Sequence, residues 1–383
     1  MIRWFFAFCL IASLPAPAQI RLSPQSEISI LTCGPDQDEL YAAFGHSAIR
    51  VTDTVSGIDL VFNYGVFKFD SKFYLNFIRG ALFYKLGVSG YDEFLGYYIH
   101  QKRSVHEQSL NLSPAEKQRI FEYLANNAKP EHATYRYDYF YNNCATKVRD
   151  VFVDICGNSL KFDETYTTSG YTIRMLTGDL LRHHRWGKLG IDICLGLPMD
   201  KKLAPFEYMY LPGYVESAFD HARLRGTSIV NKKTVLYEPR HVVIETSIFQ
   251  PWLVIGLVLA GTVIISIKDT RRNKRSVWFD YILFPVTGCC GFLILFLWFG
   301  TDHQAAANNL NLLWAVPFHF FIPWLLNSHY QKILLKSYLF ITISCIILFV
   351  PVSLILSGHL NSDLLGILAI LHTRTTALYK LIS

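Results

Sequence analysis

The pattern of hydrophobic and charged positions divides this chain into two parts. Charged residues are frequent up to about Glu245 and sparse afterwards. The run Ile248 to Ile267 contains no charged residue, so it is long and apolar enough to cross a bilayer core of about 30 Å as a helix. The sequence therefore predicts a hydrophilic domain that ends near Thr246 and a membrane domain over residues 247–383.

The second part contains five apolar segments that are expected to cross the membrane in alternating directions. Basic residues follow the first segment at once, and the positive-inside rule places this cluster in the cytoplasm. His372 and Arg374 interrupt the last segment. Asp302 and His303 follow the second segment on the outer side, where they are expected to contact the exported domain or a lipid. The five predicted spans are 248–267, 281–300, 309–326, 337–357 and 361–378.

The N-terminus has the features of a secretory signal peptide. Arg3 precedes the apolar run Trp4 to Leu14, and Ala16-Pro17-Ala18 supplies small residues for cleavage before Gln19. The apolar run is too short to span a bilayer. We therefore expect residues 1–18 to be removed and residues 19–246 to form an exported domain.

Composition excludes two other classes of function. The net charge of +6 is explained by the basic residues at the cytoplasmic ends of the spans, so it gives no support for nucleic-acid binding. The cysteines lack the CxxC spacing of zinc sites, and no metal or cofactor is expected. An even number of cysteines in an oxidising compartment permits disulfides. The four in the exported domain are Cys33, Cys144, Cys156 and Cys194.

The exported domain is expected to mix strands and helices. β-branched and aromatic residues predict strands at 28–31, 47–51 and 60–64. Ser113-Pro114-Ala115-Glu116 is a capping box with proline at the first helical position, and it predicts a helix to about Asn127. The domain therefore belongs to the α+β class.

A predicted hairpin brings a histidine and an asparagine together. If Asp53 to Gly57 is the turn, counting along the two strands sets His46 roughly opposite Asn63. Residues that oppose each other share a face of the sheet, so the amide of Asn63 can orient the imidazole of His46.

A cysteine is predicted at the start of a helix. Asn142 and Asn143 are favourable N-caps, and Val148, Val151, Phe152 and Ile155 then recur at helical spacing. The helix dipole and the free N–H groups of the first turn favour a thiolate at Cys144 and lower its pKa from the free value of about 8.5. The apolar face of this helix is expected to pack on the sheet that carries His46.

Each of these residues has an ordinary structural explanation when taken alone. A cysteine is more often a core or disulfide residue than a nucleophile, and a histidine is usually a hydrogen-bonded structural residue. Together, however, Cys144, His46 and Asn63 have the composition of a thiol nucleophile, its base and an orienting group. A membrane-anchored cysteine acyl-transfer enzyme is therefore the first interpretation.

Several runs of the sequence resemble the Bacteroidetes lipoprotein N-acyltransferase family of the Lnb type. Trp186-Gly187, Met209-Tyr210-Leu211-Pro212 and the membrane tail extend the resemblance over nearly the whole mature chain. Asn142 stands where the family favours Asp, and Ala145 stands where Ser is frequent. The runs that carry the resemblance in the exported domain are Leu31-Thr32-Cys33-Gly34-Pro35, Phe44-Gly45-His46-Ser47-Ala48-Ile49-Arg50-Val51, Phe62-Asn63-Tyr64-Gly65, Phe77-Ile78-Arg79-Gly80 and Tyr141-Asn142-Asn143-Cys144-Ala145-Thr146.

The resemblance implies a fold and a reaction. The exported domain would have a permuted papain-like fold of the NlpC type, followed by an all-α bundle of about five transmembrane helices. The protein would sit in the bacterial inner membrane and move an acyl chain from a phospholipid, through a Cys144 thioester, to the α-amine of a diacylated lipoprotein. Cys144, His46 and Asn63 would be catalytic. The residues implied to bind substrate are Arg50, Tyr64, Arg79, Arg103 and Asn143, and Arg174 is a further candidate for a phosphate head group.

Two other functions fit the same residues. A membrane-tethered cysteine amidase, peptidase or phospholipase would use the same nucleophile and pass the acyl group to water. A non-catalytic envelope protein that binds lipid or protein would instead use Cys144 in a disulfide, with Cys156 or Cys33 as the partner. The two enzymes differ in the acceptor of the acyl group, and the non-catalytic protein differs from both in that the Cys144 sulfur is not free.

Overall fold

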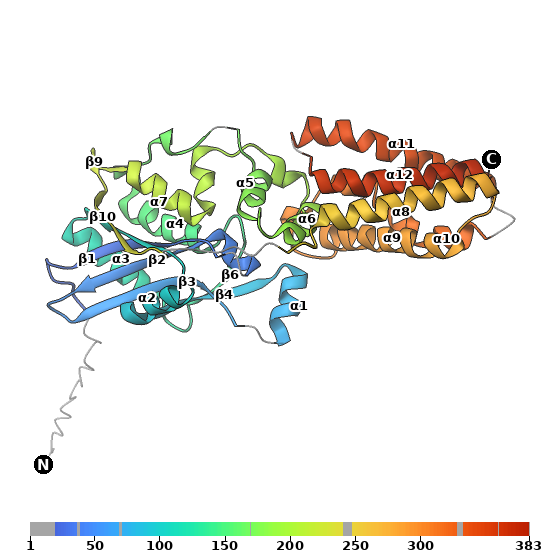
Figure 1. Cartoon of the computed structure of the whole chain (residues 1–383). Coiled ribbons are helices and arrows are strands. Elements are labelled where there is room, and N and C mark those ends of the chain that lie inside the picture. Colours follow the sequence, from blue (N-terminus) through green and yellow to red (C-terminus); the bar gives the residue numbers. More distant parts are fainter. Residues whose placement is uncertain are drawn as a thin grey trace, which may run out of the picture.

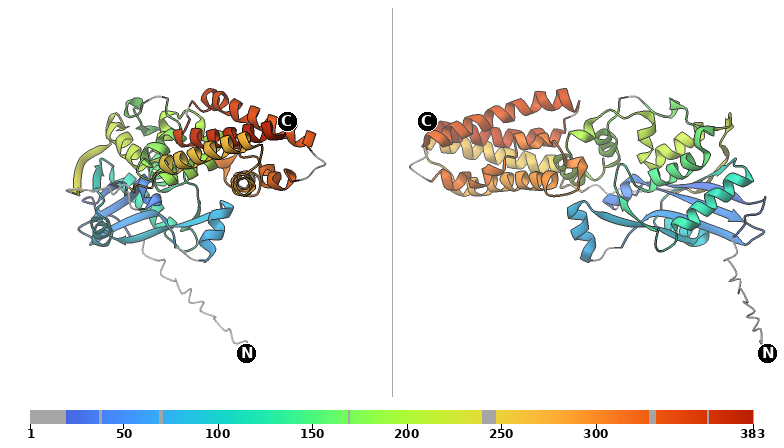
Figure 2. Two further views of the ribbon diagram at one scale, coloured as in Figure 1. Left: turned by 45° about the vertical axis from the view of Figure 1, so that its right-hand side comes forward. Right: turned by 180° about the vertical axis from the view of Figure 1, so that it is seen from behind.

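The protein has a sheet domain at one end and a bundle of long helices at the other (Figure 1). The computed structural model describes residues 20–36, 39–68, 71–168, 170–239, 247–327, 332–358 and 360–382. The predicted signal peptide and the predicted boundary at Thr246 lie outside these residues. Figure 2 shows from two further sides that the long helices extend away from the sheet domain.

The sheet domain is built on a seven-stranded sheet in which all neighbouring strands are antiparallel, in the order β10-β5-β1-β2-β3-β4-β6. The three strands predicted from the sequence are confirmed as β1 to β3. A second, small sheet contains β7 Leu160–Lys161, β8 Arg223–Leu224 and β9 Thr227–Ser228. The main strands are β1 Glu27–Cys33, β2 His46–Asp53, β3 Ile58–Val66, β4 Leu82–Gly90, β5 Val105–Leu110, β6 Thr134–Tyr137 and β10 Val230–Tyr237.

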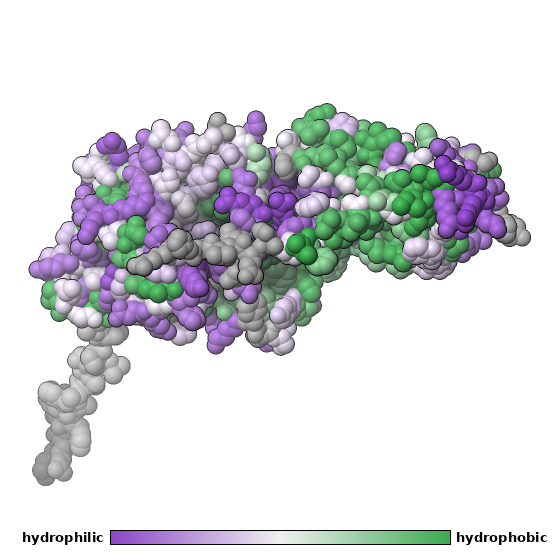
Figure 3. All heavy atoms as spheres, in the orientation of Figure 1, coloured by the Kyte–Doolittle hydropathy of each residue, from purple (hydrophilic) through white to green (hydrophobic). Residues whose placement is uncertain are grey.

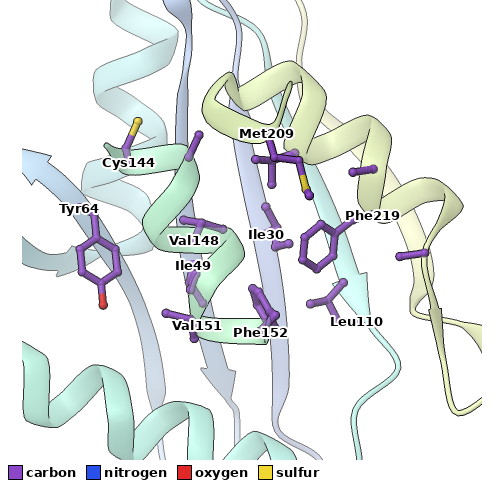
Figure 4. Close-up of a cluster of buried hydrophobic side chains, with 14 of the residues drawn as sticks. Ile30, Ile49, Tyr64, Leu110, Cys144, Val148, Val151, Phe152, Met209 and Phe219 are labelled. Carbon is purple, nitrogen blue, oxygen red and sulfur yellow. The ribbon is translucent and has the colours of Figure 1, made fainter. Parts of the chain in front are cut away.

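Helices cover both faces of this sheet. The larger core lies under α4 Cys144–Cys156 and α7 Pro212–His221, where Val148 and Phe152 pack on Ile30 and Ile49 (Figure 4). Burial of each such side chain stabilises the fold by about 1.5–3 kcal/mol. The opposite face packs on α2 Tyr91–His100. The other elements of this part are α1 Ser71–Arg79, α3 Pro114–Asn127, α5 Ile173–Leu180, α6 Arg185–Cys194, η1 Leu40–Phe44, η2 Gly157–Ser159, η3 Glu164–Tyr166, η4 Leu197–Asp200 and η5 Pro205–Tyr210.

The capping box predicted before α3 is present in the structure. The backbone N–H of Glu116 donates to Ser113 Oγ over 3.3 Å, and the backbone N–H of Ser113 donates to Glu116 Oε2 over 2.8 Å. The helix then runs from Pro114 to Asn127, as predicted, and buries Ile120, Phe121 and Leu124.

Three helices of the second part are long and apolar enough to cross a membrane, namely α8 Pro251–Arg272, α9 Val277–Phe299 and α11 Lys332–Leu356. The fifth predicted segment is helical as α12 Ser362–Ile382, which packs against α8 and α11, although it carries buried Arg374. Figure 3 shows hydrophobic residues, in green, over much of the visible face of these helices. The crossing of the membrane by all five predicted segments stays a prediction.

The third predicted span is not the continuous helix that its hydropathy suggests. It is divided into η7 Leu310–Leu313, η8 Pro317–Phe321 and α10 Ile322–Leu325, because prolines at 317 and 323 lack the N–H that a helix interior needs. The segment lies against α9, where Gly291 faces Ala315 and Gly288 faces Phe320 so closely that a Cβ at either glycine would collide with backbone atoms. Irregular backbone at membrane depth is tolerated where it is packed on protein in this way.

A buried ion cluster joins three of the membrane helices. The Arg374 guanidinium of α12 donates to Asp280 Oδ1 of α9 over 2.6 Å and to Asp269 Oδ2 of α8 over 2.8 Å. Arg374 and Asp280 are fully buried. Asp269 also accepts hydrogen bonds from the N–H and the hydroxyl of Ser276. The charge that weakened the hydropathy of α12 therefore has partners within the bundle.

A polar network docks the sheet domain onto the membrane helices. Buried Asp192 of α6 accepts from Lys188 Nζ over 2.7 Å and from Asn361 Nδ2 over 2.6 Å. Asn309 and Asn311 donate to backbone carbonyls at the end of α6. Because these polar groups satisfy one another, the end of α6 is held on the end of the bundle that faces the sheet domain.

Candidate active site

Cys144 is the first residue of α4, as the sequence predicts. Asn143 is the N-cap: its Oδ1 accepts from the backbone N–H of Thr146 over 3.0 Å, and Thr146 Oγ1 accepts from the backbone N–H of Asn143 over 2.8 Å. The amide of Asn143 also donates to the carbonyls of Tyr139 and Tyr210. These bonds engage both ends of the amide, so Asn143 fixes the helix start, and a substrate contact for it stays a prediction.

His46 and Asn63 are in contact, with 2.6 Å between His46 Nε2 and Asn63 Oδ1. The strand register differs slightly from the predicted one. Asp53 still pairs with Ile58, so the pairing continues to place Gly65, not Asn63, opposite His46. A difference of two residues keeps the same face, and the side chains meet diagonally. Because the Asn63 oxygen accepts a hydrogen bond from the Nε2–H, Nδ1 is left as the basic nitrogen.

The thiol and the imidazole come from opposite sides of the sheet. His46 stacks on Tyr98 of α2, with 6.2 Å between ring centroids, whereas α4 packs on the other face. They meet at Gly65, which has a φ of +93°. A Cβ at Gly65 would lie 3.6 Å from Cys144 Cβ and 4.0 Å from His46 Cε1. The missing side chain thus leaves the space in which the two groups approach each other.

The environment of Cys144 favours its thiolate. Burial raises the pKa of the thiol, but the charge of His46, its hydrogen bond to the sulfur, and the backbone N–H groups of Ser47 and Ala145 outweigh burial and leave this pKa below its usual value. Cys33 and Cys156 provide the contrast, because burial raises the pKa of each of these thiols. Cys144 is therefore the activated thiol of the three.

The pH dependence of Cys144 alkylation tests this arrangement. The midpoint for modification by iodoacetamide, followed by peptide mass spectrometry, should lie below the free-thiol pKa of about 8.5. In His46→Ala the burial cost remains while the opposing charge and hydrogen bond are lost, so the pKa rises. Each unit by which the pKa exceeds 7 lowers the thiolate fraction at pH 7 about tenfold. Identical pH profiles for the wild type and His46→Ala would contradict the pairing.

Two tyrosines that were not predicted as part of the site lie beside the pair, of which Tyr98 is buried and Tyr137 is half-buried. Tyr98 packs on His46, and Tyr137 lies beside Gly65 and Cys144. Burial raises the pKa of both hydroxyls, so they stay protonated. The periodic aromatics at 91, 94 and 98, and the alternating tyrosines at 135, 137 and 139, were signals of these positions in the sequence.

Arg103 is the predicted phosphate-binding residue that lies beside the site. Its guanidinium carbon is 4.8 Å from the centroid of the Tyr98 ring, and its Nε donates to the Gly34 carbonyl over 2.8 Å. Arg103 is only 5% exposed, and its Nη2 has no hydrogen-bond partner among the described residues. A substrate contact for Arg103 stays a prediction.

Other predicted substrate-binding residues have partners elsewhere. Arg50 donates to Asp59 and Glu107 and stacks on Tyr91. Arg174 donates to both carboxylate oxygens of Asp200 and to backbone carbonyls at the end of α6. Both arginines therefore hold the fold together, and the structure does not bring either one to the thiol.

Tyr64 and Arg79 also lie apart from the pair. The Tyr64 hydroxyl accepts from Asn127 Nδ2 over 3.1 Å in the core, and it points away from the Cys144 sulfur (Figure 4). Arg79 is exposed at the end of α1, where its carbonyl accepts from the Asp302 N–H over 2.8 Å. Asp302 and His303 were expected to contact either the exported domain or a lipid, and in the structure both contact the sheet domain.

The cysteines of the described residues are all free thiols, Cys33, Cys144, Cys156 and Cys194 included. No group of three or more His, Cys, Asp or Glu side chains suited to hold a metal ion occurs in the part of the chain that the structure describes. The reactive groups at this site are accordingly a thiol, an imidazole and an amide.

Comparison with known families separates the chain into two matched regions. Residues 22–178 match the family model described as the Lnb N-terminal periplasmic domain. Residues 243–383 match the one described as the Lnb transmembrane domain. No curated protein and no solved structure matches the chain. The two regions cover most of the sequence, and Cys144, His46 and Asn63 all fall in the first.

Proposed function

The chain belongs to the Lnb-type family, as a membrane protein with an N-terminal periplasmic domain, and from this premise we propose that it is a thiol-dependent lipoprotein N-acyltransferase of the bacterial inner membrane. Its acyl donor is a membrane phospholipid, and its acceptor is the α-amine of a diacylated lipoprotein. The observation that carries the proposal is the free Cys144 thiol with its pKa lowered by His46, which Asn63 orients.

The first half-reaction transfers the acyl chain to the enzyme. His46 Nδ1 takes the proton of Cys144, and the thiolate attacks the ester carbonyl of the phospholipid. The backbone N–H of Cys144, at the start of α4, is the proposed donor to the oxyanion. The C–O bond of the ester then breaks, the imidazolium returns its proton to the leaving oxygen, and a lysophospholipid departs. An acyl thioester remains on Cys144.

The second half-reaction passes the acyl chain to the lipoprotein. The neutral α-amine attacks the thioester carbonyl while His46 accepts a proton from the nitrogen. The C–S bond breaks, and the amide product leaves with Cys144 restored as the thiolate of the ion pair. Throughout both steps the Asn63 oxygen accepts a hydrogen bond from Nε2 and holds the ring in place. Nδ1 of His46 therefore serves both as the base and as the acid.

Trapping of the intermediate tests the proposal. The full chain in phospholipid nanodiscs, without lipoprotein, should gain the mass of one fatty acid less water on the peptide that contains Cys144, and hydroxylamine should remove it. An added diacylated lipopeptide should discharge the thioester with formation of an N-acyl product. Discharge at the same rate with and without lipopeptide would favour the hydrolytic alternative, in which water accepts the acyl group. No adduct, with Cys144 found in a disulfide, would favour the non-catalytic one.

A further inference from the structure

The helix α1 exposes its apolar side chains. None of its residues is buried, and Lys72, Asn76 and Arg79 recur at helical spacing on one side. The remaining circumference is mostly apolar, which is the arrangement of a helix that lies in a membrane interface. Its exposed apolar residues, between 44% and 63% accessible, are Tyr74, Leu75, Phe77 and Ile78.

Specific contacts tie α1 to the outer end of the membrane helix α9. The Asp302 N–H donates to the Arg79 carbonyl over 2.8 Å, and His303 Nε2 donates to the Phe77 carbonyl over 2.9 Å. At Gly80, where φ is +70°, a Cβ would lie 2.8 Å from the His303 nitrogen, so only glycine permits this approach. Asp302 also pairs with Arg136 of β6 over 3.0 Å.

These contacts fix both the level and the direction of α1. The helix lies beside the outer ends of the long helices and runs across their direction, as the views of Figures 1 and 2 agree. Phe299, the last residue of α9, is 73% exposed at the same level. The apolar side of α1 therefore lies near the apolar end of α9.

Aromatic rings connect α1 with the neighbourhood of the thiol. Phe77 lies 6.5 Å from Tyr139, and Tyr139 lies 5.5 Å from Tyr137, as distances between ring centroids. A second route runs from Phe73 through Phe67 and Tyr84 to Tyr137, with successive centroids 5.4, 4.8 and 4.2 Å apart. Both routes end at the ring that lies beside Gly65 and Cys144.

We propose that α1 is an in-plane membrane helix whose apolar side inserts into the outer leaflet, and that the aromatic routes guide the acyl chain of the donor phospholipid from that leaflet to Cys144. The first half stands on the placement of α1 alone. The second half rests on the function proposed above. The occupant of the apolar side is the phospholipid bilayer, because the contacts of Asp302 and His303 hold this side at the outer ends of the membrane helices.

Cysteine accessibility tests the insertion independently of any reaction. Tyr74→Cys and Lys72→Cys stand on the apolar and polar sides of α1, and Val55→Cys in the β2–β3 turn is a control that is 68% exposed. In nanodiscs, a charged maleimide should label positions 72 and 55 rapidly and position 74 about tenfold more slowly, because a charged reagent does not enter the lipid. Equal labelling of positions 74 and 72 would overturn the insertion, since the protein alone leaves Tyr74 63% exposed.

A comparison of two donors tests delivery. Leu75→Asp combined with Ile78→Asp should slow thioester formation from bilayer phospholipid about tenfold, because charge opposes insertion. Its rate with a water-soluble p-nitrophenyl ester should stay within about twofold of the wild type, since the thiol is untouched. Val55→Asp should change neither rate. If the rate of thioester formation fell equally with both donors, delivery by α1 would be overturned. It would also be overturned if the rate fell with neither donor. Absence of any thioester in the wild type would count against the proposed function and leave the labelling result standing.

Discussion

Replacing Cys144 with alanine is expected to abolish N-acylation of lipoproteins by this chain while leaving its fold intact. The sulfur is the atom proposed to carry the acyl group, and His46 lowers its pKa, whereas burial raises the pKa of Cys33, Cys156 and Cys194. Removal of the nucleophile from comparable sites lowers turnover by a factor on the order of 10⁴ to 10⁶. Mass spectrometry of lipoprotein N-termini, in cells that depend on the variant, measures the loss.

The same helix offers a matched control. Cys156 ends α4 as Cys144 begins it, it is buried to a similar degree, and burial raises its pKa. Cys156→Ala should therefore retain acylation. Cys144→Ser keeps the size and hydrogen bonding of the side chain but offers a hydroxyl that the site does not ionise, so it should be as inactive as Cys144→Ala. Persistent acylation with Cys144→Ala would refute the thioester mechanism.

The parts of the site that the sequence predicts are those set by local rules. The start of α4 follows from an asparagine cap and apolar residues at helical spacing, and the contact between His46 and Asn63 follows from counting a hairpin. The count was wrong by one residue in the position of the turn. The contact is present regardless, because a strand register that differs by two residues keeps both side chains on one face.

Residues whose role depends on distant partners were not predicted. Arg50 was expected to bind phosphate, but its guanidinium pairs with Glu107, which is 57 residues later in the sequence and lies on β5 of the same sheet. Tyr98 and Tyr137 reach the site through α2 and β6, whose placement requires the order of the whole sheet. The role of Gly65 depends on α4 and β2 meeting from opposite faces. The spacing of the aromatic residues is visible in the sequence, but the residues that they meet on other elements are not.

Hydropathy predicted where the apolar segments lie, but it did not predict whether each one forms a continuous helix. The prolines at 317 and 323 divide an apolar stretch that has the length of a span, and a sliding window does not register the backbone bonds that they remove. Conversely, Arg374 weakened the prediction for α12, although its charge is matched inside the bundle. A buried arginine in a predicted span is thus an indication of a partner on another helix.

Replacing Arg374 with leucine should destabilise the membrane domain by about 3–5 kcal/mol. The substitution leaves Asp280 fully buried without its 2.6 Å partner and removes the bond from α12 to Asp269. Arg275 Nε, 3.7 Å from Asp280 Oδ2, is the cation that remains paired with this carboxylate. Unfolding of the purified full chain by heat or by SDS, followed through α-helical circular dichroism, should show a lower midpoint.

Two variants separate loss of charge balance from loss of packing. Lys380→Leu removes an exposed cation from the last turn of the same helix and should leave the midpoint nearly unchanged. Adding Asp269→Asn and Asp280→Asn to Arg374→Leu removes the unpaired carboxylates as well, so the triple variant should regain most of the lost stability. If the triple variant were no more stable than Arg374→Leu, the arginine would act through its packing and not through its charge. If Lys380→Leu destabilised as strongly as Arg374→Leu, the cluster would have no special part in joining α8, α9 and α12.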